Sequence, residues 1–292
     1  MMHNERFFDQ TLAMIERGNS VAALPMLAGK LYNACADTAS WPQTRDALRQ
    51  HPLHAALMED PFSAHSALRP RGYPGDAGLI DIIYDKAAPG QASDLGRELF
   101  EVTVRFQAPE GVRLRRTHAE PLVTSAWQQG QRILVLACGH FREGALLIGQ
   151  DISNITLVDQ DPVSLDVVRG NHGDTANIVA ANVFRFLRAA ASRGDSFDLI
   201  YTLGLTDYLD HRAMQMLHRL AKACLAPGGT FLLANFLPAH LGTGWMDAVM
   251  DWHLIYREEA ELERFAAEAG FTARTWRDPT SSVAWCEMKH PG

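Results

Sequence analysis

The sequence has only four cysteines, and no two of them are close together in the sequence. Cys35, Cys138, Cys224 and Cys286 are far apart in the 292 residues, and no CxxC occurs. This spacing suggests neither a zinc knot nor a disulfide framework, so a reducing cytoplasm is the simplest setting. The twelve histidines include no HExxH. We therefore expect no metal.

Positive charge and long apolar runs are also scarce. The 27 basic residues are outnumbered by 34 acidic ones, which gives a net charge of -7. A general nucleic-acid binder normally shows a basic face, so we expect no nucleic-acid partner. One local cluster, Arg113, Arg115, Arg116 and His118, is interpreted as a solvated or carboxylate-binding patch. No run approaches the ~18 apolar residues of a membrane span.

The start of the chain, MMHNERFFDQ, is polar and has no apolar signal region. We expect a cytoplasmic protein with no membrane span, whose partner is a small molecule. The sequence leaves its oligomeric state open.

The chain has two parts that differ in their predicted secondary structure. Residues 1–110 have helical spacing, as at Phe7, Phe8, Leu12 and Ile15, and predict a helical cap or lid region. Residues 111–292 alternate strands with helices and predict a ligand-binding domain. We expect strands at 132–137, 155–161, 177–183, 197–205 and 228–236, followed by an antiparallel pair at 272–278 and 282–289. Near-continuous apolar runs of this kind favour a parallel sheet covered on both faces, hence an α/β, doubly wound, Rossmann-like fold.

The first of these strands leads into an unusual loop. Residues 132–144 read RILVLACGHFREG, and only Gly139 and Gly144 are glycines, so GxGxxG is missing. Gly139 allows a ligand to approach the backbone closely. The bulky His140 and Phe141 follow, and Phe141 is expected to crowd a pyrophosphate. A nucleoside without phosphates, such as S-adenosylmethionine, fits such a loop better than a dinucleotide does.

Polar residues follow several of the expected strands, where doubly wound sheets bind their ligands. Asp159 comes twenty residues after Gly139, which is the place of an acid that holds a ribose diol. Asn182 is either an adenine ligand or a cap, and Asp161 before Pro162 is interpreted as a helix cap. The residues expected to bind the cofactor in this domain are Ala137, Cys138, Gly139, Asp159, Gln160, Asn182, Val183 and Leu203.

Several segments together resemble a known group. PRGYPGD, LACGHFREG, VDQDPVSL, FDLIYTLGLTDYL, PGGTFLLANF and DWHLIYREEAEL, between about residues 65 and 290, are similar to class I S-adenosylmethionine-dependent methyltransferases. They look most like the group annotated for 3-hydroxypalmitic acid methyl ester biosynthesis, which also includes azetidine-2-carboxylate synthases. The group's first motif tends to read CGPxxE, and here His140 replaces its proline.

The resemblance implies S-adenosylmethionine as cosubstrate. It implies methyl transfer to a small-molecule carboxylate, hydroxyl or amine. It leaves open two alternatives: cyclisation of S-adenosylmethionine to azetidine-2-carboxylate, with release of 5′-methylthioadenosine, and non-catalytic binding.

Catalytic candidates come from three segments. His140 is either a general base or a residue that orients the loop. Asp207 and Tyr208 follow the fourth strand, where a substrate-facing acid and phenol are expected, although Tyr208 is as consistent with a core position. In DWHLIYR, residues 251–257, helical spacing would place Trp252 and Tyr256 on one face.

Further candidates belong to the Gly- and Pro-rich segment 69–78, which is either a plain connection or a lid. Aromatic faces favour a nearby cation, so Tyr73, Trp252 and Tyr256 are candidates to surround the sulfonium, with core packing as the alternative. Arg71 and Arg257 are candidates to bind a carboxylate, with ordinary salt bridges as the alternative.

Overall fold

The computed structural model describes residues 2–291, which divide into two compact units. The first unit contains the residues up to Arg113 together with Ala239–Leu254. The second contains Leu114–Pro238 and the residues from Ile255 onward. The sequence had suggested a division between residues 110 and 111 and had assigned segment 239–254 to the later part of the chain.

The first unit is helical, and its described residues include no strand. Prolines in the first turn begin several of these helices, where the missing N–H costs nothing. The helices of this unit are α1 (Met2–Glu16), α2 (Ser20–Cys35), α3 (Trp41–Gln50), α4 (Pro52–Leu57), α5 (Pro61–Leu68), α6 (Ala77–Asp85), α7 (Asp94–Thr103) and α12 (Gly242–Ala248).

The irregular segment that the sequence predicted lies between α5 and α6. It begins at Arg69, which has a left-handed backbone (φ 50°), and ends at Asp76. The buried carboxylate of Asp76 caps α6 by accepting the backbone N–H of Leu79 at 2.9 Å, and it lies 2.8 Å from Nε2 of His65. A buried, paired cap of this kind fixes the start of α6.

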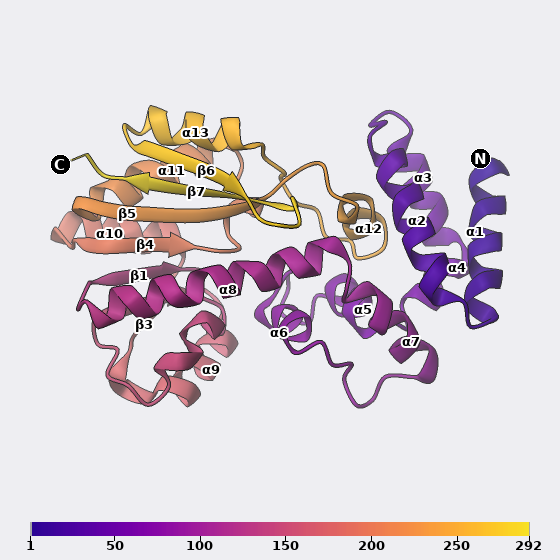
Figure 1. Cartoon of the computed structure of the whole chain (residues 1–292), viewed down its shortest axis with the longest axis horizontal. Helices are drawn as coiled ribbons and strands as arrows, with labels where there is room; N and C mark the ends of the chain where they lie inside the picture. Colours follow the sequence, from indigo (N-terminus) through magenta and orange to yellow (C-terminus); the bar gives the residue numbers. More distant parts are fainter. Residues whose placement is uncertain (1, 292) are drawn as a thin grey trace. The chain divides into compact units, whose positions relative to one another are not determined.

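The second unit contains a seven-stranded sheet in the order β3-β2-β1-β4-β5-β7-β6 (Figure 1). Strands β1 to β5 pair in parallel, and β7 is antiparallel to both of its neighbours. The doubly wound fold and the closing antiparallel pair are therefore as predicted. The strands are β1 (Ile133–Leu136), β2 (Ile155–Asp159), β3 (Asn177–Ala180), β4 (Phe197–Thr202), β5 (Leu225–Phe236), β6 (Thr272–Arg277) and β7 (Val283–Lys289).

Helices cover both faces of this sheet. On one face, α10 (Val183–Arg193), α11 (His211–Ala223) and α13 (Glu259–Glu268) contribute buried side chains to a single apolar core with the strands. On the other face, His118 of α8 (Gln107–Gln128) contacts Trp285 of β7, with ring centroids 4.4 Å apart. The 3-10 helix η1 (Arg142–Leu147) and α9 (Pro162–His172) follow β1 and β2, and two short turns, η2 (Gly173–Thr175) and η3 (Thr206–Tyr208), complete the unit.

The sequence pattern did not predict every helix, and α8 and α12 are two of those that it did not predict. Helix α8 runs for 22 residues through Pro109, Gly111 and Pro121, which are residues that normally indicate a break. Packing overrides those local preferences here, because Ala119 and Val123 on this helix are buried.

Short polar residues start the helices that follow the strands. Asp161 caps α9 by accepting the N–H of Val163 at 3.0 Å, with Pro162 in the first turn, which confirms the interpretation of that residue as a cap. Asn182 and Asp210 do the same for α10 and α11. In the part of the chain that the structure describes, no helix is long and apolar enough to cross a membrane.

His218 of α11 makes the stability of the second unit depend on pH. Its buried ring donates from Nδ1 to the carbonyl of Met214 at 2.7 Å, and burial lowers its pKa from 6.5 to about 4. As pH falls through 6.5, the unfolded chain takes up this proton and the folded chain does not, so stability is lost between pH 6.5 and 4.

We expect the free energy of unfolding to fall by about 2 kcal/mol between pH 8 and pH 5 through this residue. Urea unfolding at both pH values, for the wild type and His218→Leu, measures the contribution. The decrease should be smaller in the variant. An equally large decrease would assign the pH dependence to other groups.

Candidate functional site

The sheet reverses its strand order beside β1, which pairs with β2 on one side and β4 on the other. The segments that follow these strands leave toward different faces, and open α/β sheets bind ligands in the crevice at such a point. The residues at this edge come from the ends of β1, β2 and β4, and they include the candidate residues Gly139, Asp159 and Leu203.

The loop after β1 has an unusual backbone. Ala137, Gly139 and Phe141 have φ values of 55°, 52° and 51°, so every second residue is left-handed. Glycine adopts this conformation readily, whereas each other residue loses about 1–2 kcal/mol. The loop therefore takes up a conformation suited to glycines with a glycine at only one of the three positions. Strain of this kind is found mostly at ligand-binding sites.

Packing below the loop holds Phe141 in this strained state. Its side chain is 1% exposed, and its ring lies 5.4 Å from that of His172 between centroids. A Cβ atom on Gly144 would overlap the Phe141 ring, so this second glycine leaves room for it. The expectation that Phe141 crowds a ligand's pyrophosphate was wrong, because the ring is turned into the protein.

Asp159 joins the loop to the end of β2. Its Oδ2 accepts the backbone N–H of Gly139 at 2.8 Å, and its Oδ1 accepts the N–H of Asp161 at 2.9 Å. Each carboxylate oxygen has a second lone pair, so the group still has acceptor capacity for hydroxyl donors. Gln160 beside it is exposed, and Ala137 and Gly139 are partly exposed.

Cys138 follows the left-handed Ala137 in the loop, and its side chain is buried. Burial raises the pKa of its thiol well above the ordinary value, so the sulfur stays protonated at neutral pH. Glu143, in η1, is also buried; burial raises the pKa of its carboxyl, and Oε1 accepts the hydroxyl of Tyr201 at 2.8 Å. Glu143 was not among the site residues predicted from the sequence, where its only signal is its position as the glutamate of the CGPxxE pattern.

At the end of β3, Asn182 accepts the N–H groups of Phe184 and Arg185 at 3.0 and 3.3 Å through Oδ1. The capping role expected as one alternative is therefore present, and the Nδ2 hydrogens of this exposed residue are oriented by it. Val183 is buried in the first turn of α10.

Asp207 has partners that make it a structural residue. It is 2% exposed, Oδ1 accepts the N–H of Phe236 at 2.6 Å, and Oδ2 lies 3.4 Å from Nη1 of Arg115. Burial raises its pKa, although Arg115 acts in the opposite direction. We therefore correct the expectation of a substrate-facing acid here. Tyr208 is 39% exposed, so the core position that was its alternative is excluded. The other catalytic candidate in this unit, His140 of the loop after β1, is buried.

The segment 251–257 forms no helix, which corrects the premise that Trp252 and Tyr256 share a helical face. Asp251 has a left-handed backbone (φ 50°) and, within the first unit, forms ion pairs with Arg49 and Arg69. The segment also passes from the first unit to the second between Leu254 and Ile255. Trp252, Arg71 and Tyr73 therefore belong to the first unit and Tyr256 to the second.

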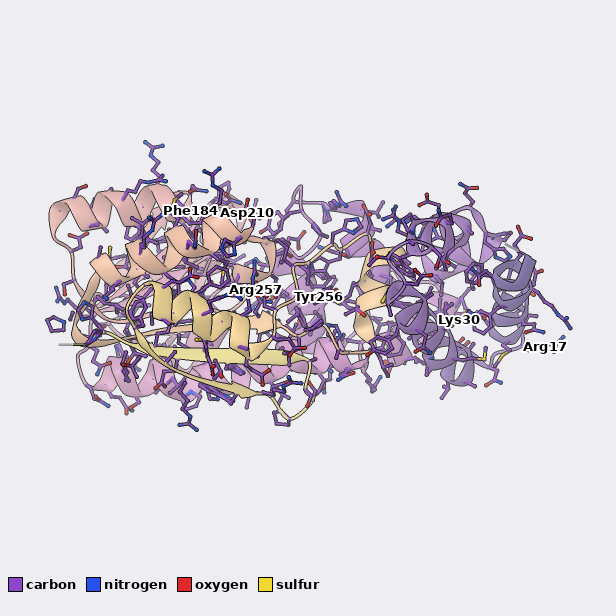
Figure 2. The ribbon with its side chains drawn as sticks, turned by 90° about the horizontal axis from the view of Figure 1, so that it is seen from above. Arg17, Lys30, Phe184, Asp210, Tyr256 and Arg257 are labelled. Carbon is purple, nitrogen blue, oxygen red and sulfur yellow. The ribbon has the colours of Figure 1, made fainter. Side chains whose placement is uncertain are left out.

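Arg257 is buried and bonded within the protein, contrary to the expectation that it binds a ligand's carboxylate. Figure 2 shows it beside Tyr256, just before α13. Its guanidinium donates to the carbonyl of Thr206 at 2.8 Å, to Oδ1 of Asn235 at 3.0 Å and to the carbonyl of Leu209, and it pairs with Glu261 at 3.4 Å. These partners are internal to the second unit, so Arg257 ties the ends of β4 and β5 together and does not anchor a ligand's carboxylate.

Among the described residues, no cluster of three or more His, Cys, Asp or Glu side chains is arranged to hold a metal ion. The basic cluster at 113–118 is also less solvated than expected, since Arg115 is 5% exposed. This burial was not predicted from the sequence, because the helix that carries Arg115 was not recognised.

No protein-family model matches the chain, and no curated protein matches it either. A solved structure from Bordetella parapertussis, described as a possible exported protein, is similar over 94% of this chain and 96% of its own, with 19% identity and a TM-score of 0.60. That likeness shows the shared fold of the two chains.

Two solved methyltransferases are more distant. The 1,6-didemethyltoxoflavin-N1-methyltransferase of Burkholderia thailandensis has 18% identity and a TM-score of 0.44 over 61% of this chain and 79% of its own. The magnesium protoporphyrin IX methyltransferase of Synechocystis PCC 6803 has 12% identity and a TM-score of 0.49 over 77% and 99%. At these identities and TM-scores, the similarity does not assign a function to the present chain.

The contact between Gly144 and Phe141 predicts that Gly144→Ala weakens the fold. Forcing an extra methyl against a buried ring typically costs about 1–3 kcal/mol. The matched control is Gly170→Ala in α9, where an added Cβ meets no atom within 4 Å. Thermal unfolding should show a lower melting temperature for Gly144→Ala and no loss for Gly170→Ala. Equal melting temperatures would mean that the loop does not depend on this packing.

Proposed function

We propose that the protein uses S-adenosylmethionine to methylate a carboxylate, hydroxyl or amine of a small molecule. The observation that carries the proposal is the hydrogen bond between Asp159 and Gly139, which joins an acid at the end of β2 to the glycine loop after β1. In a doubly wound sheet these are the positions for a ribose and for a close backbone approach.

The topology supports this choice. The sheet has the order β3-β2-β1-β4-β5-β7-β6 with an antiparallel β7, and a doubly wound Rossmann-like sheet is what the resemblance to class I S-adenosylmethionine-dependent methyltransferases implies. The loop also lacks the row of glycines with which dinucleotide-binding loops approach a pyrophosphate. A nucleoside whose ribose is held at Asp159 and whose remaining part passes over Gly139 is consistent with both features.

The reaction makes modest demands on the protein. A sulfonium is a good leaving group, so the protein mainly aligns the acceptor and excludes water. A carboxylate acceptor needs no base. A hydroxyl or amine needs one, and with Asp207 engaged by Arg115 and Phe236, the buried imidazole of His140 is our candidate. The catalytic roles of Tyr73, Tyr208, Trp252 and Tyr256 and the ligand role of Arg71 stay predictions.

We also propose a cytoplasmic setting. The four cysteines are free thiols, and Cys138, Cys224 and Cys286 are buried, as expected of a protein that does not depend on disulfides.

The test of the function is a product analysis. Purified protein is incubated with S-adenosylmethionine, with and without a panel of small carboxylates, hydroxyl compounds and amines, and the products are resolved by mass spectrometry. S-adenosylhomocysteine that forms only with an acceptor is the expected result. 5′-Methylthioadenosine formed without an acceptor would instead indicate cyclisation to azetidine-2-carboxylate. Binding without either product would leave a non-catalytic binding protein.

A second test concerns the ribose. Asp159→Ala removes charge-assisted hydrogen bonds, and we expect S-adenosylhomocysteine to bind roughly ten- to a hundred-fold more weakly. Calorimetry measures the affinity, and Asp166→Ala, an exposed acid on α9, is the control. The melting temperature of each variant separates lost binding from lost folding. An unchanged affinity would show that the ribose is held elsewhere.

A further inference from the structure

Arg115 of α8 is a buried cation at the carboxyl end of β4. It is 5% exposed, its Nη1 donates to the carbonyl of Leu203 at 2.7 Å, and Asp207 Oδ2 lies 3.4 Å from the same nitrogen. The guanidinium carbon lies 4.1 Å from the centroid of the Phe236 ring. Three groups from the ends of β4 and β5 thus fix one edge and one face of the guanidinium.

The other edge of this guanidinium is unused. Nε and Nη2 are both buried, and neither has a hydrogen-bond partner within residues 2–291. These two nitrogens form the side-on fork of arginine, whose parallel N–H groups match the two oxygens of a carboxylate. Buried donors normally have partners, so two neighbouring ones without any require an explanation.

A structural role does not explain the unused edge. Arg257, another buried arginine of the second unit, shows what such a role looks like: both of its terminal nitrogens donate, to the carbonyls of Thr206 and Leu209 and to the amide oxygen of Asn235. Its Nε alone has no hydrogen bond, and that nitrogen lies 3.4 Å from the carboxylate of Glu261, whereas Arg115 has two adjacent donors without a partner. The Asp207 partner of Arg115 compensates its charge only in part, since the 3.4 Å distance is long for an ion pair and burial raises the pKa of Asp207.

We propose that the Nε–Nη2 edge of Arg115 binds the α-carboxylate of the cosubstrate's amino-acid end, a role that rests on the proposed use of S-adenosylmethionine. Asp159 and Leu203 lie at the ends of β2 and β4, with β1 between them. Two strand spacings separate these ends by about 10 Å. A nucleoside held by its ribose at β2 thus extends its amino-acid chain over Gly139 toward Arg115. Because both nitrogens are enclosed, the carboxylate reaches them only when neighbouring side chains move aside.

The test compares two probes that differ in the carboxylate, S-adenosylmethionine and its decarboxylated analogue. Calorimetry with the wild type should show at least a tenfold preference for S-adenosylmethionine, which corresponds to about 1.4 kcal/mol. Arg115→Lys keeps the charge and loses the fork, so the preference should fall to about threefold or less. The control is Arg193→Lys, a change at the exposed arginine that ends α10, and it should keep the wild-type preference.

Asp207→Asn is a second variant of nearly the same shape. It removes the competing negative charge beside Arg115, so the preference for the carboxylate should rise at least threefold. Melting temperatures accompany every measurement. Wild-type protein that binds neither probe would overturn the proposed function. Binding of both probes with equal affinity, a preference that survives in Arg115→Lys, or an unchanged preference in Asp207→Asn would overturn this inference alone.

Discussion

The arrangement of the second unit depends on one buried carboxylate. Asp207 accepts the N–H of Phe236 at the end of β5, lies against Arg115 of α8, and accepts the N–H of Ile255 through its backbone carbonyl at 2.7 Å. Four segments far apart in the chain therefore meet at one residue. A buried charge is tolerated only with such partners, and removing one leaves the others uncompensated.

Further hydrogen bonds cross-link the same strand ends. Arg257 adds a second cross-link at the same edge by donating to Thr206 and Asn235, and the Thr206 hydroxyl donates to the carbonyl of Ala234 at 2.6 Å. Side chains that are held by packing and hydrogen bonds keep a binding site in its productive geometry. In the proposed site, the polar residues after β4 and β5 thus act as a support, and the proposed ligand-facing groups are those at the ends of β1 and β2 together with Arg115.

The sequence predicted the sheet far better than it predicted the surroundings of the site. Apolar runs between helical segments identify buried parallel strands, because burial on both faces leaves a strong pattern. Helix α8 stayed hidden, since Pro109, Gly111 and Pro121 contradict its local preferences and only tertiary packing resolves the conflict. With α8 unrecognised, Arg115 was one arginine in a basic cluster. Arg257 was misread for a related reason: spacing in DWHLIYR says nothing about which partners a side chain meets.

The glycine loop illustrates a different limit. The missing GxGxxG predicted a ligand without phosphates, but it did not predict the backbone of the loop, in which Ala137, Gly139 and Phe141 all have left-handed conformations. The conformation comes from the Phe141 ring packed beneath the loop, against His172 and over Gly144, and from the hydrogen bond to Asp159. Backbone conformation at positive φ cannot be inferred from an alanine or a phenylalanine in the sequence.

The packing of Phe141 beneath the loop affects the entropy change when a ligand binds. A loop rich in glycine explores many conformations, and ordering it on association costs conformational entropy. In this chain the entropy of residues 137–141 is lost during folding, because a buried aromatic ring and a carboxylate already hold the backbone. The nucleoside that we propose as ligand would therefore meet a loop that is already ordered, and its binding free energy would not be reduced by the entropy cost of ordering that loop.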